Sequence, residues 1–197
     1  MKKSIVFLFV ILPLSVFCQG KYTVSAGVGF PNLPRLTSVL FKNNNGYSSK
    51  GNGPYHIKVE NRLNEWFGLG ININYMDYQV SYVGEALDAN GIKVPNNILV
   101  KSHNTALNIR ANFHLLNNVE NEKWDLYIGT GLGYKFGKFK VSSDYTEYTP
   151  TITLPSISPI GLEFTIGARY FVIPNLGIYA EIGPAKSFIQ FGLSCRF

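Results

Sequence analysis

The sequence has few of the residues that build most metal and catalytic sites. Its 197 residues include two cysteines and three histidines, which are far apart along the chain. Such dispersed residues do not match the ligand spacing of a zinc site. Charged residues make up 15%, below the usual quarter. The sequence therefore predicts no metal site and no cofactor.

Long apolar runs are also missing after residue 20, so no helix is predicted to span a membrane. The one apolar run, residues 5–14, follows two lysines and precedes Cys18. This pattern is typical of a secretory signal peptide. We expect residues 1–18 to be removed and residues 19–197 to form a single exported domain. Acylation of Cys18 in a lipoprotein is the alternative, although the bulky Phe17 fits it poorly.

Eight segments instead alternate between apolar and polar or small residues, which is the period of a half-buried strand. They are residues 22–30, 55–60, 67–76, 105–115, 126–137, 160–172, 176–183 and 187–197. Their lengths suit strands of about nine residues that cross a bilayer at a tilt. In the last segment Ile189, Phe191, Leu193 and Cys195 share one face with Phe197. Without Cys18, Cys195 has no intramolecular disulfide partner.

The connections between these segments alternate between long and short. The long ones are residues 31–54, 83–101 and 142–159, and the short ones lie near 63–65, 117–123 and 174–175, with a further short link at 183–186. Outer-membrane barrels show this alternation, with short periplasmic turns and longer external loops. We expect the three long connections to be external loops.

A soluble β-sandwich or a lipocalin-like barrel would also contain alternating strands. Here the polar face is mostly Gly, Asn and isolated charges, and aromatic residues cluster near segment ends, as in interfacial girdles. These features favour an all-β fold, an eight-stranded antiparallel transmembrane β-barrel with an up-and-down meander.

Charged residues recur on the face that would point into this barrel. The candidates for an interior charge network are Lys58, Glu60, Arg110, Glu163, Arg169, Glu181 and Arg196. Side chains just fill the interior of an eight-stranded barrel, and isolated charges there are costly. We therefore predict that Arg and Glu pair and plug the lumen. A narrow solute channel is the alternative.

The chain resembles the small outer-membrane β-barrel proteins of the OmpA/OmpX-like type, particularly those common in Bacteroidetes. The resemblance covers residues 20–197 and rests on four stretches and the last residue. These are residues 106–115, 124–134, 166–171, 175–177 and Phe197. It implies a place in the cell outer membrane, with Phe197 as the assembly signal for the barrel assembly machinery. It also implies a structural or recognition role through the external loops, where an extracellular ligand would bind.

Outer-membrane lipids and lipopolysaccharide are the expected partners of the surface. The presumed external loops carry eight Lys or Arg against four Asp or Glu, and a phosphorylated outer leaflet would attract them. Ordinary solvated loop charges are the alternative. No cluster of basic residues points to nucleic acid.

Small barrels that hydrolyse lipid A place His and Ser on the membrane-facing surface, and His103 has outward parity near Ser102 and Thr105. The motif here is His-x-Thr, and no outward Glu is obvious on an adjoining strand. His56 and His114 have inward parity and are expected to form interior hydrogen bonds. We therefore predict that the protein is not an enzyme, with a lipid A-modifying hydrolase as the alternative.

Overall fold

The computed structural model describes residues 22–32, 46–87, 90–116, 123–144, 152–155, 159–185 and 187–197. Every regular element in these ranges is a β-strand. The strands are β1 (Tyr22–Asn32), β2 (Ser48–Arg62), β3 (Phe67–Leu87), β4 (Lys93–His114), β5 (Trp124–Ser143), β6 (Ile152–Pro155), β7 (Ile160–Ile173), β8 (Leu176–Ile182) and β9 (Ser187–Arg196). The expected signal peptide, residues 1–18, lies outside the described residues.

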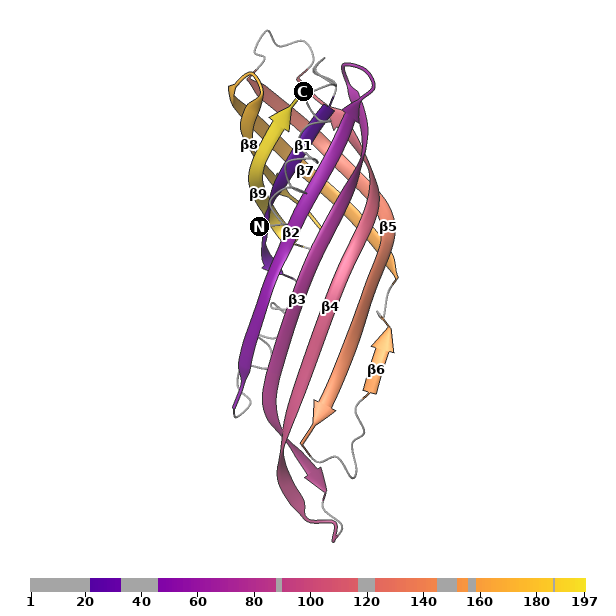
Figure 1. The fold of residues 1–197 in the computed structure, drawn as a ribbon, viewed down its shortest axis with the longest axis vertical. Coiled ribbons are helices and arrows are strands. Elements are labelled where there is room, and N and C mark those ends of the chain that lie inside the picture. The colour runs from indigo at the N-terminus through magenta and orange to yellow at the C-terminus, as the bar shows by residue number, and fades with distance from the viewer. Residues whose placement is uncertain are drawn as a thin grey trace, which may run out of the picture.

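Eight of these strands close into a ring in which each strand pairs antiparallel with its neighbours in the chain (Figure 1). The ring closes where β9 pairs with β1, in a register that includes Thr23 opposite Arg196. The short β6 pairs with β5 beyond the end of the β5–β7 ladder. The predicted eight-stranded antiparallel meander is therefore confirmed. Within the described ranges there is also no helix long and apolar enough to cross a membrane.

The tight turns β2–β3 and β7–β8 lie at the same end of the barrel as the end of β9 (Figure 1). In the β2–β3 turn the Asn64 side-chain oxygen accepts hydrogen bonds from the backbone N–H of Trp66 at 3.1 Å and of Phe67 at 2.8 Å. Asparagine favours turns because its side chain can satisfy backbone groups in this way. We call this end of the molecule the turn end.

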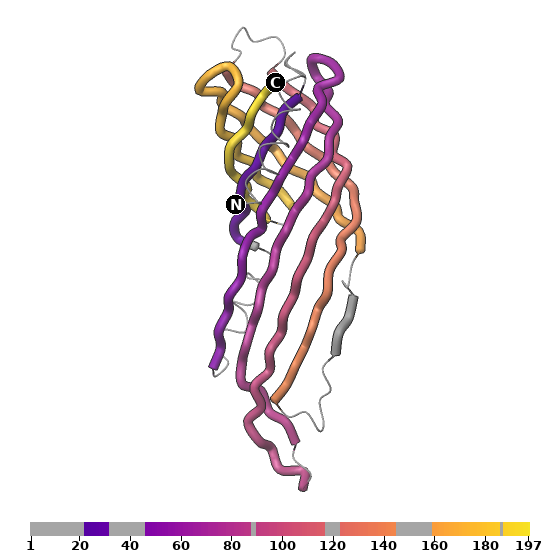
Figure 2. Tube along the Cα trace, in the orientation of Figure 1, coloured from indigo at the N-terminus to yellow at the C-terminus, as the bar shows by residue number. Residues whose placement is uncertain are grey.

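At the other end the wall is uneven (Figure 2). Strands β2 to β5 have 15, 21, 22 and 20 residues, whereas β8 and β9 have 7 and 10. The predicted loop 83–101 is wrong, because β3 and β4 stay in register from Phe67 opposite Phe113 to Leu87 opposite Lys93. The predicted loops 31–54 and 142–159 likewise contain the start of β2 and the short β6.

We call the longer part of the wall the extension, and the part where all eight strands meet the closed ring. The extension consists of residues 48–53, 77–87, 93–103 and 138–143 together with β6. Apart from β6, it contains only strands β2 to β5.

The closed ring is polar inside and apolar outside. Among the described residues, 21 polar or charged residues are buried, all but Asn96 and Ser102 in the ring, against five buried hydrophobic ones. Large apolar side chains such as Ile109, Leu132 and Leu162 are instead 60–70% exposed on the outer surface. A soluble sandwich or lipocalin-like barrel would bury its apolar face, so both of those alternatives are wrong.

In the extension this polarity is reversed. Tyr78 and Val80 of β3 now point inward and are half-buried, as is Val100, which lies opposite Val80 on β4. The outward positions carry exposed Lys101 and Lys140. The β3–β4 ladder shows no register shift at this change, so the side chains keep alternating between the same two faces and only the residue types on each face change. The apolar outer surface therefore ends at a defined height on the wall.

Candidate functional site: the interior charge network

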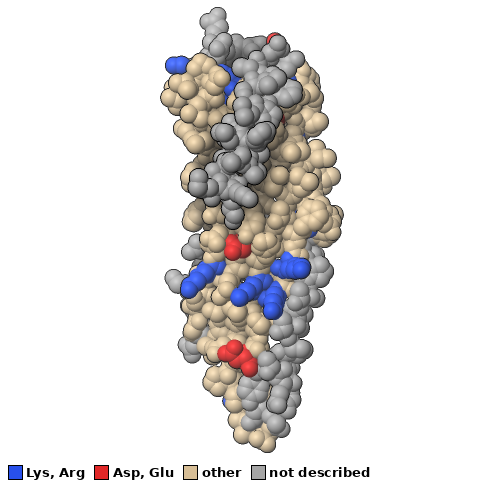
Figure 3. Space-filling view, in the orientation of Figure 1, with Lys and Arg blue, Asp and Glu red and all other residues tan. Residues whose placement is uncertain are grey.

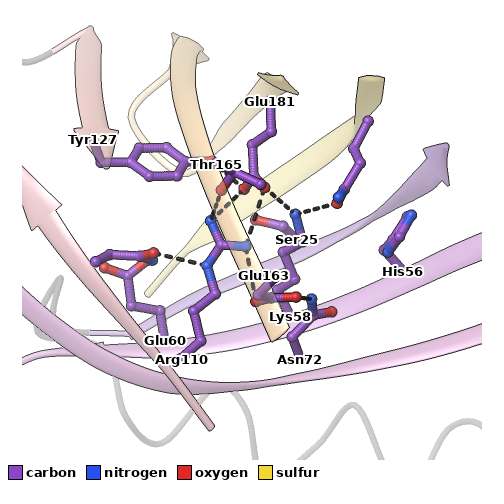
Figure 4. Close-up of polar contacts among 12 residues, drawn as sticks. Ser25, His56, Lys58, Glu60, Asn72, Arg110, Tyr127, Glu163, Thr165 and Glu181 are labelled. Atoms are coloured by element: carbon purple, nitrogen blue, oxygen red, sulfur yellow. Dashed lines mark hydrogen bonds and ion pairs between the residues drawn. The ribbon is translucent and has the colours of Figure 1, made fainter. Parts of the chain in front are cut away.

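Arg110 of β4 lies at the centre of a cluster of buried charges inside the closed ring (Figure 4). Its two terminal nitrogens reach the two carboxylate oxygens of Glu181 on β8 at 2.9 and 3.1 Å. The nitrogen Nη1 also donates to Glu163 of β7 at 3.2 Å. The Arg110 side chain is 3% exposed and its two partners are 2% exposed or less. The paired, two-point contact to Glu181 is the geometry in which arginine binds carboxylate most strongly.

Neighbouring side chains satisfy the remaining oxygens of these two carboxylates. Lys58 of β2 forms an ion pair with Glu181 at 2.7 Å, and the Tyr127 hydroxyl donates to Glu181 at 2.7 Å. Asn72 and Asn108 donate to Glu163 at 2.7 and 3.0 Å. A buried carboxylate is tolerated only when its lone pairs are satisfied, and these contacts meet that condition.

A second cluster lies next to the first and forms a closed cycle of four side chains. The two terminal nitrogens of Arg169 donate to Glu60 at 2.6 Å and to Asp125 at 2.8 Å. The two ring nitrogens of His114 lie 2.6 Å from the other oxygens of the same two carboxylates. Carboxylates only accept hydrogen bonds, so this arrangement places a proton on both His114 nitrogens.

Asn112 joins the two clusters into one network. Its side-chain oxygen accepts from Arg110 Nε at 2.8 Å, and its amide donates to Glu60 at 2.7 Å. The network has four carboxylates, from Glu60, Asp125, Glu163 and Glu181. Four buried cations, Lys58, Arg110, Arg169 and His114, meet them inside the ring, and the 32% exposed side chain of Arg62 reaches Asp125 at 3.4 Å. Every carboxylate of the network therefore has at least one cation, and Arg62 adds a partly exposed fifth cation.

Small residues make room for these long side chains. A Cβ added at Gly167 would lie 2.5 Å from Cζ of Tyr127, and one at Gly131 would lie 2.6 Å from Cγ of Glu163. Real Cβ atoms do not approach this closely, so a larger residue at either position would require the neighbour to move. The inward glycines of β5 and β7 thus fit the shape of the network.

The structure brings together six of the seven residues predicted for the interior charge network, namely Lys58, Glu60, Arg110, Glu163, Arg169 and Glu181. It places Arg196 elsewhere. The Arg196 guanidinium donates to the Pro174 carbonyl at 3.0 Å and lies over the Phe171 ring at the turn end. Gln190, not Arg196, is the β9 residue opposite Glu181. Arg196 is six residues beyond Gln190, which is about 20 Å of strand. The pairing of β8 with β9 therefore does not bring Arg196 to the network.

Sequence reasoning missed Asp125 and its partner Arg62, and gave no role in the network to His114. Asp125 directly precedes the predicted segment 126–137 and shares the inward parity of Tyr127. Extending that segment by one residue would have included it. The inward asparagines were visible in the sequence, but their hydrogen bonds to Glu60 and Glu163 depend on the cross-barrel geometry.

The other two histidines keep the parity expected for them. His56 is buried, with Nδ1 hydrogen-bonded to the Asn74 side chain and Nε2 3.4 Å from Ser187 Oγ. His103 is exposed on the outer surface and contacts Tyr75 edge to face. Ser102 points inward and bonds Asn104 at 2.7 Å, so it is on the opposite face from His103. No group of His, Cys, Asp and Glu within the described ranges could hold a metal ion.

Phe197 lies at the seam that closes the barrel. Its backbone N–H donates to the Tyr22 carbonyl at 2.8 Å, and the Tyr22 N–H donates back to the Phe197 carbonyl at 3.2 Å. The β1–β9 ladder thus continues to this residue. Its role as an assembly signal stays a prediction.

No protein-family model and no curated protein matches the chain. Solved structures with a similar fold include Ail, the attachment invasion locus protein of Yersinia pestis, at 14% identity and a TM-score of 0.44, covering 90% of this chain and 98% of that one. Ail in complex with the heparin analogue sucrose octasulfate gives 16% identity and a TM-score of 0.41, with 90% and 98% covered. The N-terminal β-barrel domain of Pseudomonas aeruginosa OprF is 12% identical, with a TM-score of 0.42, and the match covers 91% of this chain and 100% of that domain.

Proposed function

We propose that the chain is an integral outer-membrane barrel with a plugged interior, and that its role is structural or recognition at the cell surface, without catalysis. The inside-out distribution of side chains carries the proposal. Monomeric soluble proteins rarely expose an apolar patch beyond a few hundred Å². An outer surface studded with exposed Ile, Leu and Phe around a polar interior suits lipid on the outside.

The height of the apolar surface supports insertion into a bilayer. Aromatic rings bound it at both ends, with Trp66, Phe67 and Phe113 in contact at the turn end and Tyr55 stacked on Tyr75 toward the extension. Phe67 and Tyr75 are eight residues apart on β3, which is about 27 Å of strand. A tilt of about 40° reduces this to roughly 21 Å, close to the apolar band of about 25 Å in such barrels.

Insertion can be tested by vesicle flotation and a heat-modifiability gel. The protein without residues 1–18 should float with phosphatidylcholine vesicles and migrate differently on the gel before and after boiling. A monomer that remains stable in detergent-free buffer would contradict the proposal.

In the proposed orientation the turn end, with its tight turns, faces the periplasm, and the longer extension lies outside the cell. Lys93, at the end of the β3–β4 hairpin, has a side chain that is 71% exposed. Trypsin added to intact cells should therefore cut at Lys93. Cleavage only after the outer membrane is permeabilised would show the opposite orientation.

The plug is supported by the paired charges and the hydrogen-bonded carboxylates of the interior network. Water and ions would have to break these contacts to pass. Planar-bilayer recordings should therefore show no stable, sizeable channels. Regular conductance steps from the purified barrel would overturn the plug and favour the narrow solute channel.

The non-catalytic role is supported by the neighbours of His103: Ser102 lies on the opposite face of β4, and the hydroxyl on the same face of that strand belongs to Thr105, in a His-x-Thr and not a His-x-Ser pair. Lipid A mass spectra from cells with the gene, without it, and with His103→Ala should be identical. A lipid A species that disappears in both the deletion and the variant would establish the hydrolase alternative.

The extension and the segments that connect its strands are the proposed surface for an extracellular ligand. The barrel assembly machinery is the expected partner for insertion, through the last strand and Phe197. Deleting Phe197 should lower the amount of folded protein in the membrane, and an unchanged amount would remove that role.

A further inference from the structure

Four lysines gather on the outer surface of the extension, around a groove of about 340 Å³. They are Lys50 of β2, Lys101 of β4, and Lys138 and Lys140 of β5, and we call them the lysine patch. All four are exposed. On the face shown in Figure 3, blue side chains gather below the middle of the barrel with one red side chain just above them, and the tan surface farther up carries little charge.

Strand register forces these lysines together. Lys101 lies directly opposite Lys140, and Lys138 lies opposite His103, the next outward residue of β4. Like charges directly opposite each other on a strand pair are destabilising. An anion between Lys101 and Lys140 would remove that repulsion.

The chain does not supply this anion from its described residues. None of the four ammonium groups forms an ion pair there, whereas exposed Lys93 pairs with Glu85 at 2.7 Å. The one carboxylate in the groove, Asp77, accepts from the Asn52 backbone N–H at 3.0 Å and lies 3.5 Å from its side-chain amide. The lysine patch therefore carries an excess of positive charge.

The patch lies just beyond the apolar outer surface. Thr105, Tyr75 and Phe136 form one row across β4, β3 and β5, at the edge of that surface. Lys101 precedes Thr105 by four residues on β4, which is about 13 Å of strand toward the extension. The reversal of side-chain polarity in the extension marks the same boundary. Headgroups of a surrounding lipid would lie at this height.

We propose that the lysine patch binds the phosphate groups of a phosphorylated outer-leaflet lipid of the lipid A class, whose acyl chains lie against the apolar surface of the closed ring. This inference rests on the proposed insertion into the outer membrane. The continuity of the patch with the apolar surface favours a lipid over a soluble phosphate or a nucleic acid. Lysine ammonium groups bind phosphate as point charges, which suits a patch without a rigid pocket.

The test uses the whole barrel in neutral detergent, titrated with lipid A that carries its phosphates and with dephosphorylated lipid A. Lipid retained after gel filtration is measured by native mass spectrometry. The double variant Lys101→Ala with Lys140→Ala should bind phosphorylated lipid A about tenfold more weakly or worse, since two charge-assisted contacts are lost. The control, Lys93→Ala with Lys123→Ala, removes the same charge outside the patch and should bind as the wild type does.

Three results would overturn the proposal. Equal loss in the control would show attraction by net charge alone. Equal retention of dephosphorylated lipid A would show that phosphate is not recognised. Complete displacement of the lipid by inorganic phosphate at the same concentration would show a soluble-anion site. Flotation with neutral phosphatidylcholine vesicles separates these outcomes from failure of the proposed function, because a barrel that inserts there still spans a membrane.

Stability gives a second readout that a merely structural lysine would not produce. In neutral detergent Lys140→Ala should raise the unfolding temperature slightly, because it removes the repulsion from Lys101. With phosphorylated lipid A present, the same substitution should lower it relative to the wild type. A shift of the same sign in both conditions would contradict bound phosphate at the patch.

Discussion

In the closed ring every strand has two neighbours and the inward side chains bond one another, whereas the extension continues only β2 to β5 with the short β6. The two regions share the same strands but have opposite polarity. Arg110 is buried inside the ring. Lys101, nine residues earlier on the same strand, is exposed on the outer surface of the extension. If the ring is inserted in a membrane as proposed, the surroundings of the wall, lipid or water, decide which face carries the polar residues.

This comparison predicts where the folding free energy resides. A buried ion network is costly to desolvate, and its members depend on one another. Exposed charges in the extension are solvated and screened, so each contributes little. Substitutions in the ring should therefore lower the free energy of unfolding more than changes of similar size in the extension.

The largest expected effect is that of Arg110→Met. The substitution keeps much of the side-chain volume but leaves Glu163 and Glu181 without their shared cation. Breaking a buried pair in this way costs about 3–5 kcal/mol. The free energy of unfolding is measured by urea titration in lipid vesicles, with folded protein counted by gel mobility.

Arg196→Met is the matched control, since it removes the same group from a residue outside the network. Arg196 loses its hydrogen bonds to the Pro174 carbonyl, which are worth about 1 kcal/mol. Equal losses for the two variants would mean that the network contributes no more than an ordinary hydrogen bond.

A smaller effect is expected when the interior is overfilled. Gly167→Ala puts a Cβ about where the Tyr127 ring lies, at 2.5 Å from Cζ. Tyr127 is fully buried, and its hydroxyl donates to Glu181, so the ring has little freedom to move. Overpacking of this kind costs about 1–3 kcal/mol, measured by the same titration.

Gly84→Ala tests the same change in the extension. A Cβ there would meet the end of the Ile98 side chain at 2.8 Å. Because that side chain can rotate and is only half-buried, the loss should be well below that of Gly167→Ala. A greater loss at Gly84 would reverse the ranking of the two regions.

The contrast also explains what sequence reasoning could and could not find. Alternation identified all eight strands of the ring, because an apolar outer surface and a polar interior impose a period of two. On β3 the outward apolar residues end at Tyr75, and apolar side chains resume at Tyr78 and Val80 on the other face. Because the apolar residues change face there, the alternation pattern ends near Tyr75, and residues 83–101 were predicted to form a loop.

The interior network was only partly predictable for a different reason. Parity shows that Glu60, Glu181 and Arg196 face inward, but it does not give their heights in the barrel. Those heights depend on the stagger between strands, which the register fixes. The grouping of Glu60 with Arg169, and the exclusion of Arg196, therefore required the structure.

The smallest effect is expected from shortening the β3–β4 hairpin. Pairing of β3 with β2 ends at Ser81, and pairing of β4 with β5 ends at Ile98. Beyond these residues the Asp144 N–H at the end of β5 donates to the Asn97 carbonyl at 3.3 Å, a bond that the shortening keeps, and the Ser143 hydroxyl donates to Asn96 Oδ1 at 2.6 Å, a bond that it removes. Replacing residues 84–96 by Asn-Gly joins Val83 to its partner Asn97 and should change the free energy of unfolding by less than about 1 kcal/mol.

The shortened barrel retains Lys101 and Lys140, so it should also bind phosphorylated lipid A as the wild type does. Two outcomes would break the comparison between ring and extension. A loss near that of Arg110→Met would mean that the hairpin stabilises the ring, and a loss of lipid binding alone would mean that the hairpin contributes to the lysine patch. If neither occurs, the wall beyond the apolar surface is free to vary in sequence and length, because the lipid-facing surface and the charge network below it set the stability of the barrel.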